Sequence, residues 1–182
     1  ILENEKSALK RGAKILCEIV GYGATADAFH LTTPSPEGIG AAKAMNNALN
    51  ENKIQTNQID YINAHGTSTP YNDRNETIAI KNTFKEDSIN LSISSTKSST
   101  GHLLGAAGAI EAIACIISIN NSFVPPTINF KTPDPECDLN YTVNKSLNKN
   151  INFAMSNTFG FGGHNASLIF KKYEQNWRII KL

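Results

Sequence analysis

The amino-acid sequence predicts an α/β domain built on a mixed, mainly parallel sheet of five strands. Short apolar runs rich in β-branched residues alternate with segments in which apolar residues recur at helical spacing. This alternation gives the order βαβαβα, which is typical of a parallel sheet covered by helices. Two further apolar runs then follow one another directly, so an antiparallel pair is expected at the end of the sheet.

The individual elements follow in chain order from these patterns. Residues 1–14 are predicted to be the end of a helix that runs into a loop, and residues 21–36 a loop, because Gly, Thr and Pro punctuate them. Asp73 is the predicted N-cap of a helix that ends near residue 84. The other expected helices are residues 38–51 and an apolar helix within residues 103–119. The five expected strands are residues 15–21, 59–64, 91–94, 153–158 and 165–172.

Composition limits the classes of function. The 17 basic and 16 acidic residues leave a formal net charge of +1, so charge suggests neither a nucleic-acid partner nor a disordered acidic tail. The three cysteines are far apart without CxxC spacing, and we interpret them as reduced structural thiols rather than metal ligands. The longest apolar run, residues 103–119, contains Glu111 and is too short to cross a bilayer comfortably, so no membrane role is expected.

The length of 182 residues fits one large domain or half of a larger protein. We expect a domain over residues 1–173 and an unrelated tail at residues 174–182. The sequence starts with Ile1 instead of Met, so its true start and any targeting peptide are expected to be missing.

The stretch from residue 94 to residue 114 is the expected centre of function. It carries Lys97, Gly101 and His102 among small hydroxyl residues and continues into an apolar helix that contains Glu111. A purely structural turn and N-cap would account for the glycines and hydroxyls. It would not account for Lys97 and Glu111, because an unpaired charge on an apolar stripe is costly.

Two further polar motifs also follow predicted strands, where α/β sheets place their ligands. HGTST begins at His65, after residues 59–64, and FGFGGHN begins at Phe159, after residues 153–158. Taken alone, His65 is more often a structural histidine, and the threonines can be simple turn formers. Two histidines at equivalent strand ends, one of them near a lysine, favour catalysis.

These motifs resemble the second half of a β-ketoacyl-acyl carrier protein synthase of the elongating type. The resemblance rests on HGTST, on STKSSTGHLLGAAGA from Ser95 and on FGFGG, and it extends to VGYG, VPPTIN and CDLNY. It implies a thiolase-like fold and a decarboxylating Claisen condensation that extends a fatty acyl chain by two carbons. It also implies an acyl carrier protein as partner and a homodimeric full-length enzyme, with no cofactor.

The resemblance assigns a role to each motif residue. His65 and His102 donate hydrogen bonds to the malonyl thioester oxygen and stabilise the enolate, the strategy of an oxyanion hole. Lys97, paired with Glu111, sets the local electrostatics and the orientation of His102. By the same resemblance, Phe161, with Gly160 and Gly162, forms a second oxyanion hole and a gate. The pantetheine arm is bound by Thr32, Thr67 and Thr69. A possible monovalent cation is held by Asn63, Glu111, Ser156 and Asn157.

The sequence departs from the family pattern in three ways. His164 stands where a small hydroxyl residue is usual, and Asn72 stands where a glycine is common. Nothing matches the Ala-Cys-Ser motif that carries the family's nucleophile. We interpret Cys17, Cys115 and Cys137 as structural, so the chain is expected to be the C-terminal half of an enzyme and inactive by itself.

Several alternatives stay open. Polyketide ketosynthase domains share both histidines, and a non-catalytic ketosynthase-like partner subunit is also possible, although such subunits would be expected to lose the histidines and the lysine. GYGATA after the first strand formally matches a dinucleotide fingerprint, but prolines follow where its helix should start. The four histidines lack the spacing of a zinc site. Frequent Asn, Ile and Lys indicate AT-rich coding sequence, and the expected location is a plastid of the apicoplast type or the bacterial cytoplasm.

Overall fold

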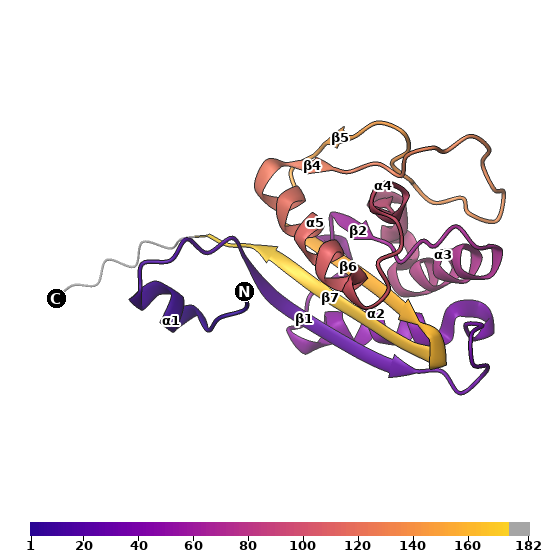
Figure 1. Ribbon diagram of the computed structural model, residues 1–182, viewed down its shortest axis with the longest axis horizontal. Coiled ribbons are helices and arrows are strands. Elements are labelled where there is room, and N and C mark those ends of the chain that lie inside the picture. The colour runs from indigo at the N-terminus through magenta and orange to yellow at the C-terminus, as the bar shows by residue number, and fades with distance from the viewer. Residues whose placement is uncertain (175–182) are drawn as a thin grey trace.

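The computed structural model describes residues 1–174, so the end of the expected tail lies outside the described residues. Two layers of helices cover a central sheet, and α1 lies beyond the start of β1, away from that sheet (Figure 1). The helices are α1 Glu5–Lys10, α2 Ile39–Glu51, α3 Pro70–Phe84, α4 Lys97–Thr100 and α5 Ala107–Asn121. The strands are β1 Cys17–Ala26, β2 Tyr61–Asn63, β3 Ser92–Ser94, β4 Phe123–Val124, β5 Leu147–Asn148, β6 Phe153–Gly160 and β7 His164–Lys172.

The five-stranded sheet has the order β1-β7-β6-β2-β3. Strand β2 pairs in parallel with β3 and β6, whereas β7 is antiparallel to both β6 and β1. Four strands therefore run in one direction and β7 runs against them, which confirms the predicted mixed, mainly parallel α/β sheet. A separate two-stranded sheet, formed by β4 and β5, was not predicted.

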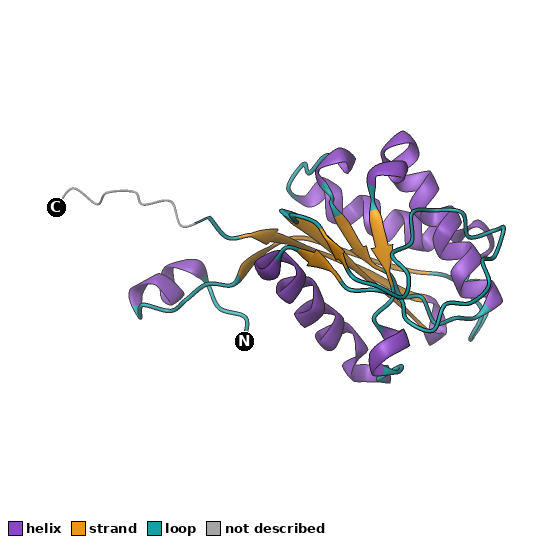
Figure 2. Ribbon diagram, turned by 90° about the horizontal axis from the view of Figure 1, so that it is seen from above, coloured by secondary structure: helices purple, strands orange, loops and turns teal. Residues whose placement is uncertain are grey.

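Alternation along the strands divides the core into two parts, one on each face of the sheet (Figure 2). On one face, Ile62 and Met155 pack with buried residues of α2 and α3. On the other face, Tyr61 and Ala154 pack with buried residues of α5. Neighbouring positions of one strand thus face different helices, and this decides which polar side chains can meet near the site.

The first strand is longer than predicted, because β1 continues through residues 21–26, which we expected to form a loop. Its glycines are needed for close helix packing. A Cβ at Gly23 would lie 2.0 Å from the carbonyl oxygen of Ala44, and one at Gly21 would lie 2.4 Å from that of Ala48. Because both glycines lie within a strand rather than at a strand-to-helix turn, GYGATA does not have the geometry of a dinucleotide fingerprint.

One predicted helix start was wrong. Helix α3 begins at Pro70, with Thr69 at the N-cap, so Asp73 lies in its first turn. From there Asp73 Oδ1 accepts a hydrogen bond from the Ser68 amide at 3.2 Å, which stabilises the turn before the helix. Helix α5 begins at Ala107, after a short 3₁₀ turn, because the chain takes a left-handed conformation at Leu104.

The segment Leu104–Asn121 is long and apolar enough to cross a membrane by composition, with a mean hydropathy of 1.4. In the structure its helical part, α5, lies along the sheet. Glu111, Cys115 and Ile119 face inward, and Ile113 and Ile117 are about half exposed on the outer side.

We expect Ile62→Ala to destabilise the protein by about 2–5 kcal/mol, because Ile62 is fully buried in the central strand β2 and its truncation leaves a cavity. The matched control is Ile89→Ala, because Ile89 is 75% exposed and its truncation should change stability by less than about 0.5 kcal/mol. Urea denaturation of both variants measures the difference. Equal effects at the two positions would contradict the assignment of the core.

Candidate active site

The three polar motifs meet at one edge of the sheet. Strands β2, β3 and β6 run in the same direction, so their carboxyl ends lie side by side. His65 follows β2, Lys97 follows β3 and Phe159 lies near the end of β6. The structure thus brings together groups that are far apart in the sequence.

The two histidines are neighbours. The ring centroids of His65 and His102 lie 5.5 Å apart, with the ring planes nearly perpendicular at 85°. The Leu104 amide donates a hydrogen bond of 3.1 Å to Nδ1 of His102. Because Nδ1 accepts this bond it carries no proton, so the proton of the neutral imidazole is on Nε2. The left-handed backbone of Leu104, with φ of 51°, belongs to the same turn.

His65 is held neutral by its surroundings. Only 5% of it is exposed, and burial, assisted by the nearby Lys97 and His102, lowers its pKa from 6.5 to about 3. Its Nδ1 is enclosed and has no hydrogen-bond partner among the described residues. The ring of Phe159 packs against it, with centroids 5.7 Å apart. At neutral pH His65 is therefore an uncharged imidazole that can donate one N–H.

Lys97 and Glu111 form a buried ion pair. The Lys97 ammonium donates to Oε1 of Glu111, and the two side chains are 5% and 2% exposed. Thr158 also donates to Glu111, at 3.5 Å. Burial raises the pKa of Glu111, and the hydrogen bond from Lys97 opposes that rise. The two charges compensate each other where water is excluded.

Sequence analysis missed Glu76, a buried carboxylate of α3. It accepts hydrogen bonds from the backbone amides of His65 and Gly66, both at 2.9 Å, and one of 3.4 Å from the Asn157 side chain. Burial raises its pKa, and these hydrogen bonds oppose the rise. Its position in line with Ile80 and Thr83 of the predicted helix indicated that it faces inward, but the sequence does not show that its partners are backbone amides.

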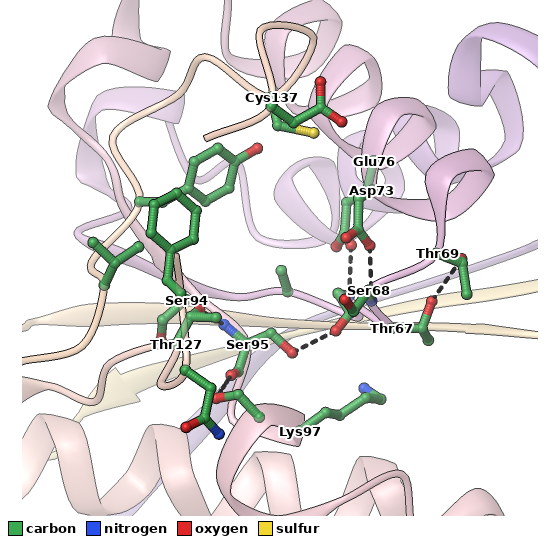
Figure 3. Close-up of a pocket in the computed structure, with 18 of the residues that line it drawn as sticks. Thr67, Ser68, Thr69, Asp73, Glu76, Ser94, Ser95, Lys97, Thr127 and Cys137 are labelled. Carbon is green, nitrogen blue, oxygen red and sulfur yellow. Dashed lines mark hydrogen bonds between the residues drawn. The ribbon is translucent and has the colours of Figure 1, made fainter. Parts of the chain in front are cut away.

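A cavity of about 650 Å³ opens beside these groups (Figure 3). Its walls include Lys97 and His102 on one side and Thr67 and Thr69 of the HGTST turn on another. The hydroxyls of Thr67 and Thr69 lie 3.0 Å apart. An elongated polar ligand could therefore reach His102 past these hydroxyls.

Thr32, which we expected to lie with these threonines, does not line the cavity. Because β1 continues to Ala26, the loop that contains Thr32 begins later than expected. Thr32 is exposed and lies near the turn that contains Gly162. There its amide donates to Nδ1 of His30, and the carbonyl of Leu31 accepts from the Gly162 amide at 2.7 Å.

The FGFGG segment forms a turn between β6 and β7. Phe161 is 75% exposed, and Gly162 has a φ of 78°, a conformation in which a side chain would be strained. Gly160 is extended, with φ of −112°, so it does not need the freedom of a glycine. In this segment Phe159 is the residue that contacts His65.

One of the side chains proposed for a monovalent cation, Asn157, points away from the others. Asn63 donates to Thr96, and Glu111 accepts from Lys97. Asn157 lies on the opposite face of the sheet, next to Ser156 in the sequence, and bonds to Ser167 and Glu76. Successive side chains of strand β6 point to opposite faces of the sheet, so Ser156 and Asn157 face different layers. Within residues 1–174, no three His, Cys, Asp or Glu side chains are grouped to hold a metal ion.

The three cysteines are free thiols. Cys115 is fully buried and Cys17 and Cys137 are partly buried, and in each case burial raises the thiol pKa. A raised pKa keeps the thiol protonated and weakens it as a nucleophile. The geometry therefore agrees with a structural role for all three.

Comparisons with known proteins identify one family over most of the chain. Residues 16–131 match the family described as "Beta-ketoacyl synthase, C-terminal domain". The chain is 56% identical to 3-oxoacyl-[acyl-carrier-protein] synthase 2 of Staphylococcus aureus and 53% identical to that of Synechocystis, each over 96% of the chain. It spans 42% of the length of each relative.

Solved structures show the same fold. A ketosynthase of a type II polyketide system, in complex with its acyl-carrier protein, superposes with a TM-score of 0.91 at 38% identity. A β-ketoacyl synthase from Burkholderia phymatum gives 0.88 at 40% identity. Each covers 94% of this chain, and this chain covers 42% and 41% of them.

We expect the buried state of His65 to make the protein less stable as the pH falls from 6.5 towards 3. In this range the unfolded chain binds a proton at His65, whereas the folded chain, with a pKa of about 3, does not. Protonation therefore favours unfolding, and His65→Gln should remove this part of the pH dependence. The raised pKa values of Glu76 and Glu111 act in the opposite direction but are common to both proteins.

The measurement is the free energy of unfolding against pH for wild type, His65→Gln and the control His30→Gln, an exposed histidine. The control should keep the slope of the wild type. An unchanged slope in His65→Gln would show that His65 is not held neutral in the folded protein.

Proposed function

Because this chain belongs to the β-ketoacyl synthase family and carries its C-terminal domain, we propose that the full-length protein is an elongating 3-oxoacyl-acyl carrier protein synthase. It condenses an acyl group held on the enzyme with malonyl-acyl carrier protein, and the fatty acyl chain grows by two carbons. The observation that carries this proposal is the adjacent pair of imidazoles, in which burial keeps His65 neutral and Nδ1 of His102 accepts from the Leu104 amide.

The first chemical step is loss of carbon dioxide from the malonyl group. The bond to the carboxylate carbon breaks, and its electron pair remains on the thioester as an enolate. His65 and His102 donate hydrogen bonds to the enolate oxygen, where negative charge develops. The Leu104 amide at Nδ1 of His102 supports this role, because it leaves the proton on the other ring nitrogen.

In the second step the enolate carbon attacks the carbonyl carbon of the acyl thioester, and the cysteine thiolate leaves. We assign the nucleophilic cysteine to a part of the protein outside this chain, which spans 42% of the length of its relatives. The raised pKa values of the three thiols here are consistent with that assignment. The backbone amide of Phe161 donates to the oxyanion of this step, and the left-handed turn at Gly162 permits the loop to move as a gate.

Lys97 and Glu111 are positioning groups rather than proton carriers in this scheme. Their buried pairing supports this assignment, because it fixes the segment that leads to His102. Thr67 and Thr69 bond the amides of the pantetheine arm, which is consistent with their place in the cavity wall.

The proposed partner is an acyl carrier protein loaded with an acyl or malonyl group, and the full-length enzyme is a homodimer. One structural neighbour is a ketosynthase in complex with its acyl-carrier protein. The relatives named above are bacterial. We place the enzyme in the bacterial cytoplasm or in a plastid.

A polyketide ketosynthase is the second candidate, because structural neighbours at 38% identity belong to such systems. The higher identity to fatty acid enzymes, 53–56%, favours chain elongation in fatty acid synthesis. Retention of both histidines and of Lys97 weighs against a non-catalytic partner subunit.

We expect His65→Ala and His102→Ala in the full-length protein each to lower malonyl decarboxylation by about a hundredfold or more, the usual effect of removing an oxyanion-hole donor. Lys97→Ala should have an effect of about the same size, because it leaves Glu111 unpaired and frees the segment that leads to His102. The assay measures carbon dioxide released from malonyl-acyl carrier protein. Lys53→Ala, at an exposed lysine after α2, is the control and should retain the wild-type rate. Near-normal rates in the histidine variants would refute the proposed roles.

A further inference from the structure

A serine hydroxyl joins the loop that carries His65 to the segment between β3 and α4, the helix that precedes His102. Strands β2 and β3 pair in register up to Asn63 and Ser94, and the Ala64 amide still donates to the Ser94 carbonyl at 2.9 Å. From there one chain leads to His65 and the other to Lys97. The Ser95 hydroxyl crosses between them and donates to the Gly66 carbonyl at 2.7 Å (Figure 3).

Gly66 permits this approach. Its φ is +39°, and a Cβ placed on it would lie 2.5 Å from the Cβ of Ser95. Any larger residue at position 66 would push the two loops apart. The glycine of HGTST and Ser95 are therefore a matched pair that sets the separation of the loops.

The backbone on either side of His65 is held from two directions. Glu76 accepts from the amides of His65 and Gly66, and Ser95 donates to the Gly66 carbonyl. Ser95 is only 7% exposed, so water does not readily replace its hydroxyl. Without that hydroxyl, the Gly66 carbonyl would lose its bond to the neighbouring loop.

Ser95 is itself fixed by the next segment of chain. Its amide donates to Oγ1 of Thr127 at 2.9 Å, and its carbonyl accepts from Ser98 at 2.9 Å. The Ser98 hydroxyl in turn accepts from the Ile128 amide at 2.9 Å. In Figure 3, Ser95 lies between Thr127 and the HGTST turn that carries Thr67.

We propose that Ser95 is a positioning residue, which sets the separation of the His65 and His102 imidazoles through its hydrogen bond to Gly66. This inference rests on the proposed function. Ser95 lines the cavity, but its hydroxyl proton is given to the Gly66 carbonyl, so in this proposal it acts through His65. Two donors that share one enolate oxygen need accurate placement, and a small shift of one loop weakens both bonds.

The test is a double-mutant cycle in the full-length protein, with malonyl decarboxylation as the assay. Ser95→Ala removes the hydroxyl but keeps the Cβ that packs on Gly66. We expect kcat to fall about tenfold with KM for malonyl-acyl carrier protein unchanged, the effect of losing one buried hydrogen bond. In a His65→Ala background, Ser95→Ala should change kcat by less than about twofold, because its effect passes through His65.

The outcomes separate the two proposals. If His65→Ala lowers kcat but Ser95→Ala has no effect, or has the same effect in both backgrounds, the role of Ser95 is refuted and the proposed function stands. If His65→Ala keeps the wild-type rate, the proposed function fails and the role of Ser95 fails with it. Ser146→Ala, at an exposed serine before β5, is the matched control and should behave as wild type.

A second variant covers the case in which Ser95→Ala does not fold. Ser95→Cys has a similar size and a weaker hydrogen-bond donor. It should lower kcat by about twofold to tenfold relative to wild type, again only when His65 is present. A wild-type kcat in Ser95→Cys together with unchanged thermal stability would refute the role of the hydroxyl bond.

Discussion

The buried ion pair between Lys97 and Glu111 is the interaction on which the site depends. Removing one partner of a buried pair leaves an uncompensated charge and typically costs about 3–5 kcal/mol. The pair joins α4 to α5 across the turn that contains His102. The ends of that turn are therefore fixed, although His102 and its neighbours are exposed. The ion pair thus gives the exposed His102 a definite position, although no packed core surrounds this histidine.

The other half of the site is supported from the opposite face of the sheet. Glu76 reaches the His65 turn from α3, whereas Glu111 reaches Lys97 from α5. Each buried carboxylate serves a different loop, and the strand ends between them bring the loops together. Parallel pairing of β2 with β3 places the two chains at a fixed spacing, and the polar contacts beyond the strands extend that spacing to the imidazoles.

The motifs could be located from sequence because each follows a strand, and their meeting could be predicted because parallel strands end at one edge. Contacts between residues in different layers of the fold could not be predicted from the sequence. Asn157 was grouped with Ser156, although neighbours in a strand face opposite ways, and Thr32 was misplaced because β1 extends beyond its expected end. Glu76 was overlooked because its partners are backbone amides, which leave no pattern in the sequence. Sequence therefore identified the reacting groups better than their supports.

The charge state of the site explains why neutral donors suit the proposed reaction. The malonyl carboxylate is already anionic in the ground state, so a free cation would bind the substrate as tightly as the transition state and give no acceleration. Glu111 compensates the charge of Lys97, and burial keeps His65 neutral. In the proposed reaction the hydrogen bonds from the ring N–H groups strengthen as charge moves from the departing carboxylate to the thioester oxygen. On that proposal, the ion pair and the low pKa of His65 serve the same selectivity, for the enolate over the bound substrate.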